Sequence, residues 1–151
     1  MSLLWMTIVT VAILQASVFC TTIYLHRAKC HRGLELHPAL ELLMHLHITI
    51  FTSIVPREWV AVHRKHHHFS DKEGDPHSPV LNGMWYVLFR NFEMYGKEAR
   101  NPQTIAKYTP EWRDDLLDRI GLKHGGIVFG VALFILMFGC CLLYTSDAAD
   151  E

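Results

Sequence analysis

The chain has 151 residues, of which 50% are hydrophobic and only 19% are charged. This is the length of one domain, and so apolar a composition excludes a disordered or collagen-like chain and favours a membrane protein. The formal net charge is −1 with histidines neutral, so no global positive field indicates a nucleic-acid partner. The four cysteines form no C-x-x-C pair and indicate neither a disulfide framework nor a zinc ribbon.

The first predicted element is the uncharged segment Leu3–Leu25, which is 23 residues long. As a helix it would extend about 34 Å at about 1.5 Å per residue, enough to cross a hydrocarbon core of roughly 30 Å. No lysine or arginine precedes it, and no clear small-x-small cleavage site follows it. We therefore expect a retained membrane-spanning helix rather than a signal peptide.

The second predicted helix, Ala39–Val55, is apolar but short, and it contains one glutamate and two histidines. All 14 lysines and arginines lie between Arg27 and Lys123. Positive segments stay in the cytoplasm, so we expect the central region there and both ends outside. A single crossing by Ala39–Val55 would divide the basic residues between the two sides. An interfacial or re-entrant helix avoids this.

Three further elements complete the predicted fold. Met84–Tyr95 is rich in aromatic residues and is typical of a helix at the level of the lipid headgroups. A charged helix is predicted over Glu111–Ile120, with Thr109 as its N-cap. Gly125–Tyr144 is a second uncharged run that could span a bilayer, and residues 145–151 form an acidic tail that does not look native. The sequence thus predicts an all-α integral membrane protein with interfacial amphipathic helices and a cytoplasmic, histidine-rich cap.

Histidine is the outlier of the composition, because ten of the eleven histidines lie between His26 and His77. The first cluster consists of His26 and His31, with the spacing H-x4-H, directly after the predicted span. Two side chains five positions apart point in different directions on a regular α-helix. We therefore expect either that the helix ends or distorts near Ala28–Cys30, or that the two imidazoles bind different ions.

The second cluster, residues 63–68, reads HRKHHH. On a helix His63, His66 and His67 share one face, and three neutral imidazoles on one side are typical of a site for a first-row transition metal. His68 lies about 140° around the helix from His63 and is expected to point elsewhere. The alternative is a cationic strip that, together with Arg64 and Lys65, lies on anionic headgroups.

The residue pattern argues against three common metal sites. A zinc protease needs H-E-x-x-H, but Arg64 stands where the glutamate should be. Structural zinc sites usually include cysteine, and Cys30 is the only one near the clusters. The E-x-x-H pairs of ferritin-like di-iron sites are absent. An all-imidazole site suits iron, copper or zinc. If both clusters bind one centre, they must lie on the same side of the membrane, in agreement with the distribution of positive charge.

The remaining polar residues of this region have plainer interpretations. Four isolated histidines are expected to be hydrogen-bonded or interfacial side chains rather than ligands: His37, His45, His47 and His124. Three carboxylates follow the second cluster: Asp71, Glu73 and Asp75. They either lie in a solvated loop or accept the second N–H of metal-bound imidazoles, as carboxylates commonly do.

The segments HRAKCHRGLELHP and REWVAVHRKHHHFSDKEGDPHSP resemble the first and second histidine boxes of membrane-bound fatty acid desaturases, most closely the bacterial acyl-CoA Δ9 type. The resemblance runs from about Ile23 to Tyr95 and extends, more weakly, through the predicted span Gly125–Tyr144. It implies an oxidoreductase of the bacterial inner membrane, with its histidine boxes on the cytoplasmic side. Such an enzyme uses two iron ions and O2 to place a cis double bond in a saturated acyl chain, carried by CoA or a lipid. A separate ferredoxin or cytochrome b5-type donor, with its NAD(P)H reductase, supplies the electrons.

The resemblance also implies a ligand set. It comprises five histidines: His26, His31, His63, His66 and His67. Asp75 and His77, in the D-P-H motif, are expected to support these ligands without touching the metals. The family has a third histidine box that this sequence lacks. We therefore expect residues 1–144 to be the amino-terminal part of a desaturase domain that is inactive alone and binds iron incompletely.

Two alternatives remain open at this stage. A membrane hydroxylase or ketolase with histidine boxes, acting on alkyl, sterol or carotenoid chains, would have the same ligands and a different product. A membrane metal-binding or transport protein is less favoured, because transport sites usually place ionisable residues within the spans. The two predicted spans contain no histidine, aspartate or glutamate.

Overall fold

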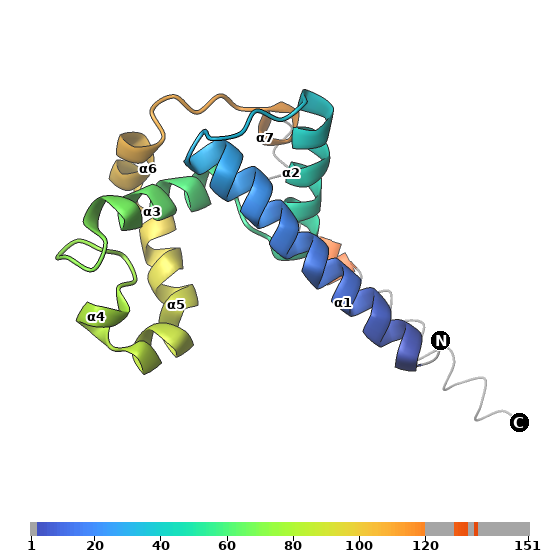
Figure 1. The fold of residues 1–151 in the computed structure, drawn as a ribbon, viewed down its shortest axis with the longest axis horizontal. Helices are drawn as coiled ribbons and strands as arrows, with labels where there is room; N and C mark the ends of the chain where they lie inside the picture. The colour runs from blue at the N-terminus through green and yellow to red at the C-terminus, as the bar shows by residue number, and fades with distance from the viewer. Residues whose placement is uncertain (1–2, 120–128, 133–134, 136–151) are drawn as a thin grey trace, which may run out of the picture.

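The computed structural model describes residues 3–119, 129–132 and 135, and the fold reported below is that of these residues (Figure 1). Its named elements are all helical and follow one another as α1 (Leu3–Cys20), η1 (Thr21–Cys30), α2 (Pro38–Thr52), α3 (Pro56–Phe69), α4 (Pro79–Asn82), α5 (Met84–Ala99), α6 (Pro102–Tyr108) and α7 (Leu116–Arg119). No strand occurs among the described residues, so the predicted all-α class is confirmed for this part of the chain.

The helices α1 and η1 form one rod that begins where the first span was predicted. The uninterrupted helix Leu4–Cys30 is long and apolar enough to cross a membrane, and it continues beyond the predicted end at Leu25. Large side chains along α1, such as Leu4, Trp5 and Val18, are exposed. Such an exposed apolar surface is typical of a helix whose surroundings are not water.

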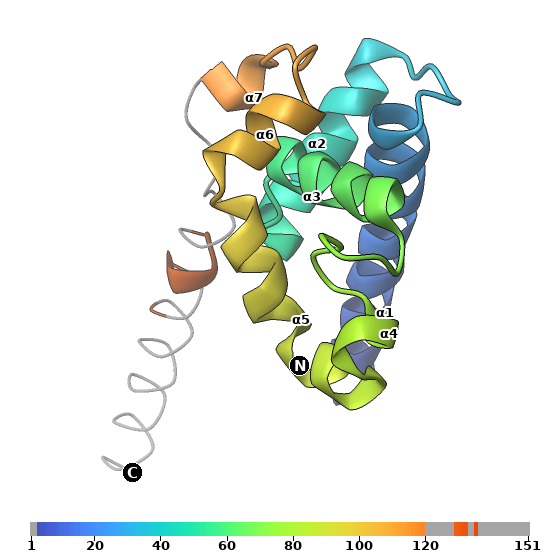
Figure 2. The same ribbon diagram turned by 90° about the vertical axis from the view of Figure 1, so that its left-hand side faces the viewer.

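The end of this rod carries the hydrophobic core. Cys20, Tyr24 and Leu25 pack against Met44 and Ile48 of α2. α3 lies between η1 on one side and α5 and α6 on the other (Figure 2). The core therefore sits at the junction of the rod with the remaining helices, and it fixes η1 beside α3.

The second predicted helix is shorter than expected and is followed by a sharp bend. α2 ends at Thr52, where Ser53 adopts a left-handed backbone conformation with φ of 57°. α3 then begins at Pro56, whose fixed φ suits a first helical position. The axes of α2 and α3 differ by 88°, the geometry of a broken span or a re-entrant loop.

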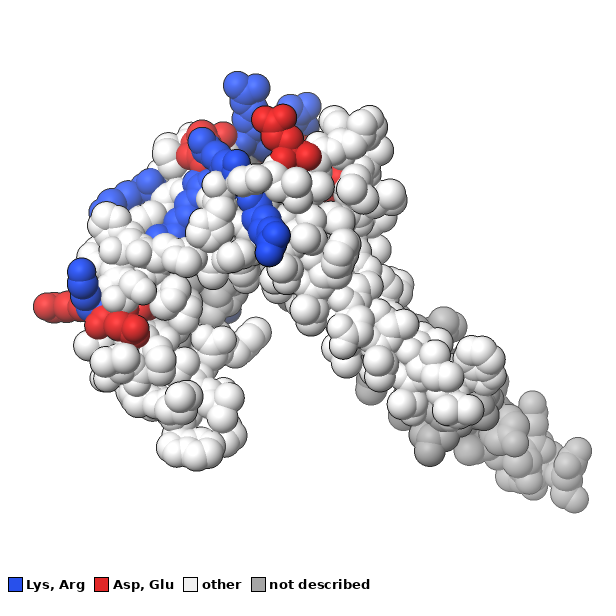
Figure 3. All heavy atoms as spheres, viewed as in Figure 1, with Lys and Arg blue, Asp and Glu red and all other residues white. Residues whose placement is uncertain are grey.

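The aromatic segment predicted over Met84–Tyr95 is helical and extends to Ala99 as α5. Its apolar side chains face outward, with Trp85, Phe89 and Phe92 at 71%, 76% and 89% exposure. Figure 3 shows charged side chains over the upper part of the molecule, whereas the lower ends of α1 and of the α4–α5 region are uncharged in this view. The charge distribution thus separates a polar upper part from two apolar ends.

The prediction of a charged helix over Glu111–Ile120 is wrong about where the helix begins. Within the described part of this range, residues 111–119, helix is present only in α7, Leu116–Arg119. Asp115 is the N-cap of α7, because its Oδ1 accepts the N–H groups of Leu117 and Asp118 at 2.9 and 3.0 Å. Thr109 is not the N-cap of this helix but the C-cap of α6, where its backbone N–H and its hydroxyl both donate to the carbonyl of Ile105. Glu111, at the predicted start of the helix, pairs instead with Arg32 and Arg64.

Other predictions fall on parts of the chain that are not described. The predicted span Gly125–Tyr144 lies outside the described residues except for 129–132 and 135, and 129–132 are helical. His124 and the tail 145–151 also lie outside them.

Replacing Asp115 with alanine should lower the free energy of unfolding by about 1–2 kcal/mol, because α7 loses its cap. The same carboxylate pairs with the buried imidazole of His45, which would lose its partner. Thermal unfolding of the detergent-solubilised chain measures the effect. Asp114→Ala, at the exposed neighbouring carboxylate, is the control and should unfold like the wild type. Equal losses in both variants would contradict the assigned cap.

Candidate metal centre

In the first histidine cluster, His26 lies in the π-helix η1 and His31 is the C-cap of this helix. The backbone N–H of His31 donates to the carbonyl of His26 at 3.0 Å, which is the i→i+5 pattern of this helix type. A residue five positions along is therefore brought over the residue where the turn began, and the two imidazoles face the same way. Their Nε2 atoms are 3.2 Å apart. Of the two alternatives left by the sequence, the helix distorts, and it does so over Thr21–Cys30 rather than only near Ala28–Cys30.

The second cluster lies on α3, as predicted. His63 and His67 are one α-helical turn apart, and their Nε2 atoms are 3.0 Å from each other. The ring of His63 also stacks on Trp59, with centroids 4.5 Å apart and planes at 14°. This indole limits the positions that the imidazole can adopt.

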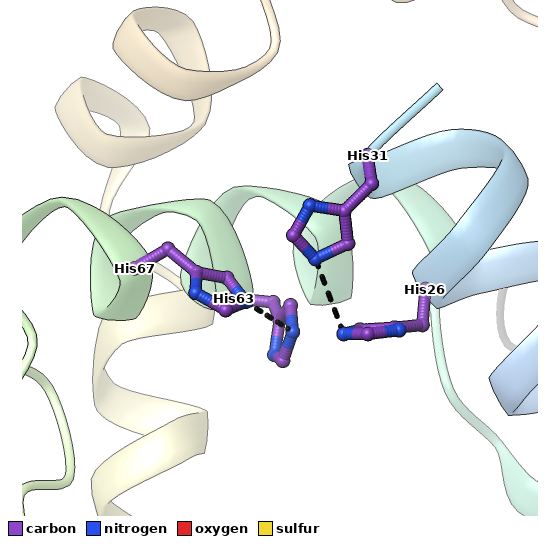
Figure 4. A group of neighbouring side chains, drawn as sticks. All are labelled: His26, His31, His63 and His67. Carbon is purple, nitrogen blue, oxygen red and sulfur yellow. Dashed lines mark hydrogen bonds between the residues drawn. The ribbon is translucent and has the colours of Figure 1, made fainter. Parts of the chain in front are cut away.

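The two pairs meet in one cluster. The rings of His26 and His63 are 4.9 Å apart, and those of His31 and His67 are 4.8 Å apart (Figure 4). One donor nitrogen from each of the four residues lies within 4.8 Å of all the others. Both histidine boxes therefore lie on the same side of any membrane that α1 crosses.

The donor set fits one metal ion. Imidazole nitrogens bind first-row ions at about 2.1 Å, so two nitrogens on one ion are at most about 4.2 Å apart. The observed spread needs only small ring rotations to reach this limit. The nitrogens at 3.0 and 3.2 Å already have a separation that adjacent ligands can adopt. Four imidazoles without a thiolate suit iron, copper or zinc.

The protonation state favours ligation. Burial, together with the neighbouring histidines, lowers the pKa of His63 to about 4. Burial and nearby imidazoles also lower the pKa of His67. Both rings are thus neutral near pH 7, and a neutral imidazole is the form that binds a metal.

His66 is placed apart from the other four predicted ligands. Its Nδ1 lies 2.9 and 3.0 Å from the two carboxylate oxygens of Asp75, whose side chain is fully buried. The ring of His77 stacks on His66, with centroids 4.6 Å apart and planes at 18°. Because a carboxylate fixes Nδ1, the Nε2 of His66 is the nitrogen left for another partner.

Asp75 is itself held by the loop after α3. It accepts the backbone N–H groups of Asp71 and His77 at 2.9 and 3.0 Å. Burial raises the pKa of this carboxyl, but the hydrogen bonds from His66 and from the two amides outweigh burial and lower it. The carboxylate is therefore ionised and oriented before any metal binds.

The remaining histidines described by the structure lie elsewhere. His68 is exposed, with its ring 4.8 Å from that of Phe69 and 6.0 Å from that of Tyr108. His37 caps α2 by accepting the N–H of Ala39, and His47 is within hydrogen-bond distance of Ser17 Oγ at 3.0 Å. These positions agree with the plain roles expected from the sequence.

His45 belongs to a group that sequence reasoning missed. It is buried, pairs with Asp115 and lies within 4.8 Å of a carboxylate oxygen of Asp118. The partners are about 70 residues apart in the chain, so no local spacing links them. Asp115 and Asp118 also accept hydrogen bonds within α7 and its approach, which gives the group a structural role.

Comparisons with known proteins place this geometry in context. The chain is 35% identical over 122 residues to "Delta-9 acyl-lipid desaturase 2" of Arabidopsis thaliana, covering 78% of this chain and 38% of the relative. It is 30% identical over 118 residues to "sn-1 stearoyl-lipid 9-desaturase" of Synechocystis, covering 78% and 35%. It is 28% identical over 110 residues to "Hex-5-enoyl-[acyl-carrier protein] acetylenase" of Moorena producens, covering 60% and 34%. The chain thus spans little more than a third of each of these relatives. Neither a family model nor a solved structure matches it.

Changing any one of the four clustered histidines to alanine should weaken binding of one divalent ion at least tenfold, because one of four ligands is lost. Co2+ binding to the detergent-solubilised chain, followed by visible absorption, measures the affinity. His68→Ala is the matched control, since it lies on the same helix outside the cluster. A loss for His68→Ala equal to that for His67→Ala would contradict the assignment.

The metal-free chain should lose stability as the pH falls from about 6.5 to about 4. The pKa of His63 is about 4 in the fold and 6.5 in the unfolded chain, so the unfolded state binds more protons in this interval. Melting temperatures measured across this range test the sign. His63→Ala should show a shallower decline, and a decline as steep as the wild type's would refute the role given to this residue.

Proposed function

Because this chain is related to the fatty acid desaturases over part of their length, we propose that it provides part of the iron-binding core of a membrane-bound acyl desaturase. The single observation that carries the proposal is the convergence of four imidazoles from two histidine boxes on one point. The substrate is a saturated acyl chain carried by a lipid or by CoA.

The chain's own residues divide between two iron ions. His26, His31, His63 and His67 would hold the first ion, because their donor nitrogens form one cluster. His66 would hold the second ion through Nε2, since Asp75 occupies its Nδ1. Five histidines are fewer ligands than two ions need. We therefore expect this chain alone to bind iron incompletely and to lack activity.

The chemistry explains why a metal is required. An unactivated methylene group has no acidic proton, so a side-chain base cannot remove its hydrogens. When bound, iron would supply the oxidising power that uses O2, two electrons and two protons to remove two hydrogens and leave a cis double bond and two waters. The electrons would come from a separate ferredoxin or cytochrome b5-type donor with its reductase.

The protein's contribution is to keep the ligands neutral and oriented. Trp59 covers one face of His63, which limits water at that ring and holds its plane. Asp75 fixes the tautomer of His66 by accepting its Nδ1–H. Neutral rings in fixed planes lose little freedom when they bind a metal, so affinity does not depend on ordering them first.

The proposed membrane placement follows from the same cluster. α1 would cross the bilayer, and the 88° bend between α2 and α3 would return the chain to the side on which η1 ends. The outward apolar face of α5 would lie among the headgroups and upper acyl chains. The basic residues near both boxes support a cytoplasmic location for this side in the proposal.

The proposal is tested by comparing this chain with the complete reading frame obtained by sequencing the source DNA onward from the codon for Leu143. The 151-residue chain should bind at most about one iron and give no product. The complete protein should bind two irons and convert stearoyl substrates to an alkene with a suitable donor. His63→Ala should abolish turnover in it. An alcohol product would instead identify a hydroxylase, and full turnover by the 151-residue chain would refute the proposed incompleteness.

A further inference from the structure

We propose that Arg64 is the positioning residue of this metal centre. Its guanidinium ties the C-terminal end of η1 and the segment 108–111 to α3, and it thereby sets the distance between the His26–His31 pair and the His63–His67 pair. The inference rests on the metal centre proposed above and adds a residue that binds no metal itself.

The Arg64 side chain makes four polar contacts. Nη2 donates to the carbonyl of Lys29 at 2.8 Å, and Nε donates to the carbonyl of Cys30 at 3.1 Å. Nη1 donates to the carbonyl of Tyr108 at 2.8 Å and pairs with the carboxylate of Glu111. Three segments far apart in the sequence therefore meet at one guanidinium, which is only 20% exposed.

The contacts of Arg64 lie next to the backbone of two of the clustered histidines. The last carbonyls of a helix have no partner within it, and Arg64 supplies partners for two of them in η1. Cys30 directly precedes His31, and Arg64 directly follows His63. One side chain thus connects the backbone beside a ligand of the first pair to the backbone beside a ligand of the second.

The charge of Arg64 is balanced locally. A bare guanidinium close to a bound cation would repel it. Glu111 pairs with both Arg64 and Arg32. Burial raises the pKa of Glu111, but hydrogen bonds from these arginines outweigh it and bring the value to about 2. The carboxylate is therefore ionised at every pH at which the imidazoles are neutral.

The geometry requires arginine rather than any cation. The acceptors are two carbonyls at the end of η1, one carbonyl at Tyr108 and one carboxylate. A planar guanidinium has five N–H donors in a fixed fork, whereas a lysine ammonium is a single point with three. Lysine at position 64 could hold one segment but not both.

The test measures Co2+ affinity and the visible Co2+ spectrum of the full 151-residue chain in detergent. Arg64→Gln should weaken binding about 10–100-fold, the range seen when a group that orients metal ligands is removed. Arg64→Lys should recover only part of the loss. Arg57→Gln is the matched control, because Arg57 also lies on α3 and donates to Thr109 Oγ1 in the same segment, at 3.4 Å. It should bind Co2+ like the wild type.

A double-mutant cycle with His26→Ala separates positioning from general destabilisation. If Arg64 brings the first pair within reach of the ion, His26→Ala should weaken binding strongly in the wild type and little in Arg64→Gln. Helix content, followed by circular dichroism, accompanies each measurement. The inference would be overturned if the losses of Co2+ affinity in the two single variants simply multiplied in the double variant. An Arg64→Gln variant with unchanged affinity and spectrum would also overturn it. A wild-type chain with no histidine-dependent Co2+ binding would instead overturn the metal centre, and this inference with it.

Discussion

Nitrogen atoms that share a metal ion, as we propose for the four clustered histidines, must lie within about 4 Å of one another, and this short distance would organise the described part of the molecule. It joins a histidine pair at the end of an apolar rod to a second pair on a helix that begins 25 residues after His31. The packing of Tyr24 and Leu25 against α2 holds the end of the rod. Contacts of α3 with η1, α5 and α6 hold the other pair. The core serves mainly to bring two short stretches of backbone together.

The same distance limits how the chain can meet a bilayer. Two clusters that touch cannot be separated by roughly 30 Å of hydrocarbon, so the intervening segment must return to the side from which it came. In the proposed membrane placement, the break between Thr52 and Pro56 would accomplish this with a left-handed residue and a proline-started helix. Charged side chains gather over the upper part of the molecule in Figure 3, and exposed apolar side chains lie on α1 and α5.

Features that depend on local spacing could be predicted from the sequence. The uncharged run of α1, the helical face shared by His63 and His67, and the exclusion of His68 all follow from helix period and charge. The ring of His66 lies 5.7 Å from that of His67, but its Nδ1 pairs with a carboxylate nine residues later, and a helical period cannot show such a partner. The helix expected from Glu111 starts later because its first residue pairs with Arg64, 47 residues away. Contacts outside the helical repeat, rather than weak local signals, account for the pairing of His66 and for the later start of the helix.

The π-helical turn of η1 gives the spacing of the first box a physical meaning. In an α-helix the residue that follows one full turn is the fourth, and in a π-helix it is the fifth. The number of residues between His26 and His31 therefore matches the wider π-helical turn that carries them. A protein that shortened this gap by one residue would need a narrower coil to present the same two rings. The spacing of the two histidines and the width of the helix at that point consequently have to change together.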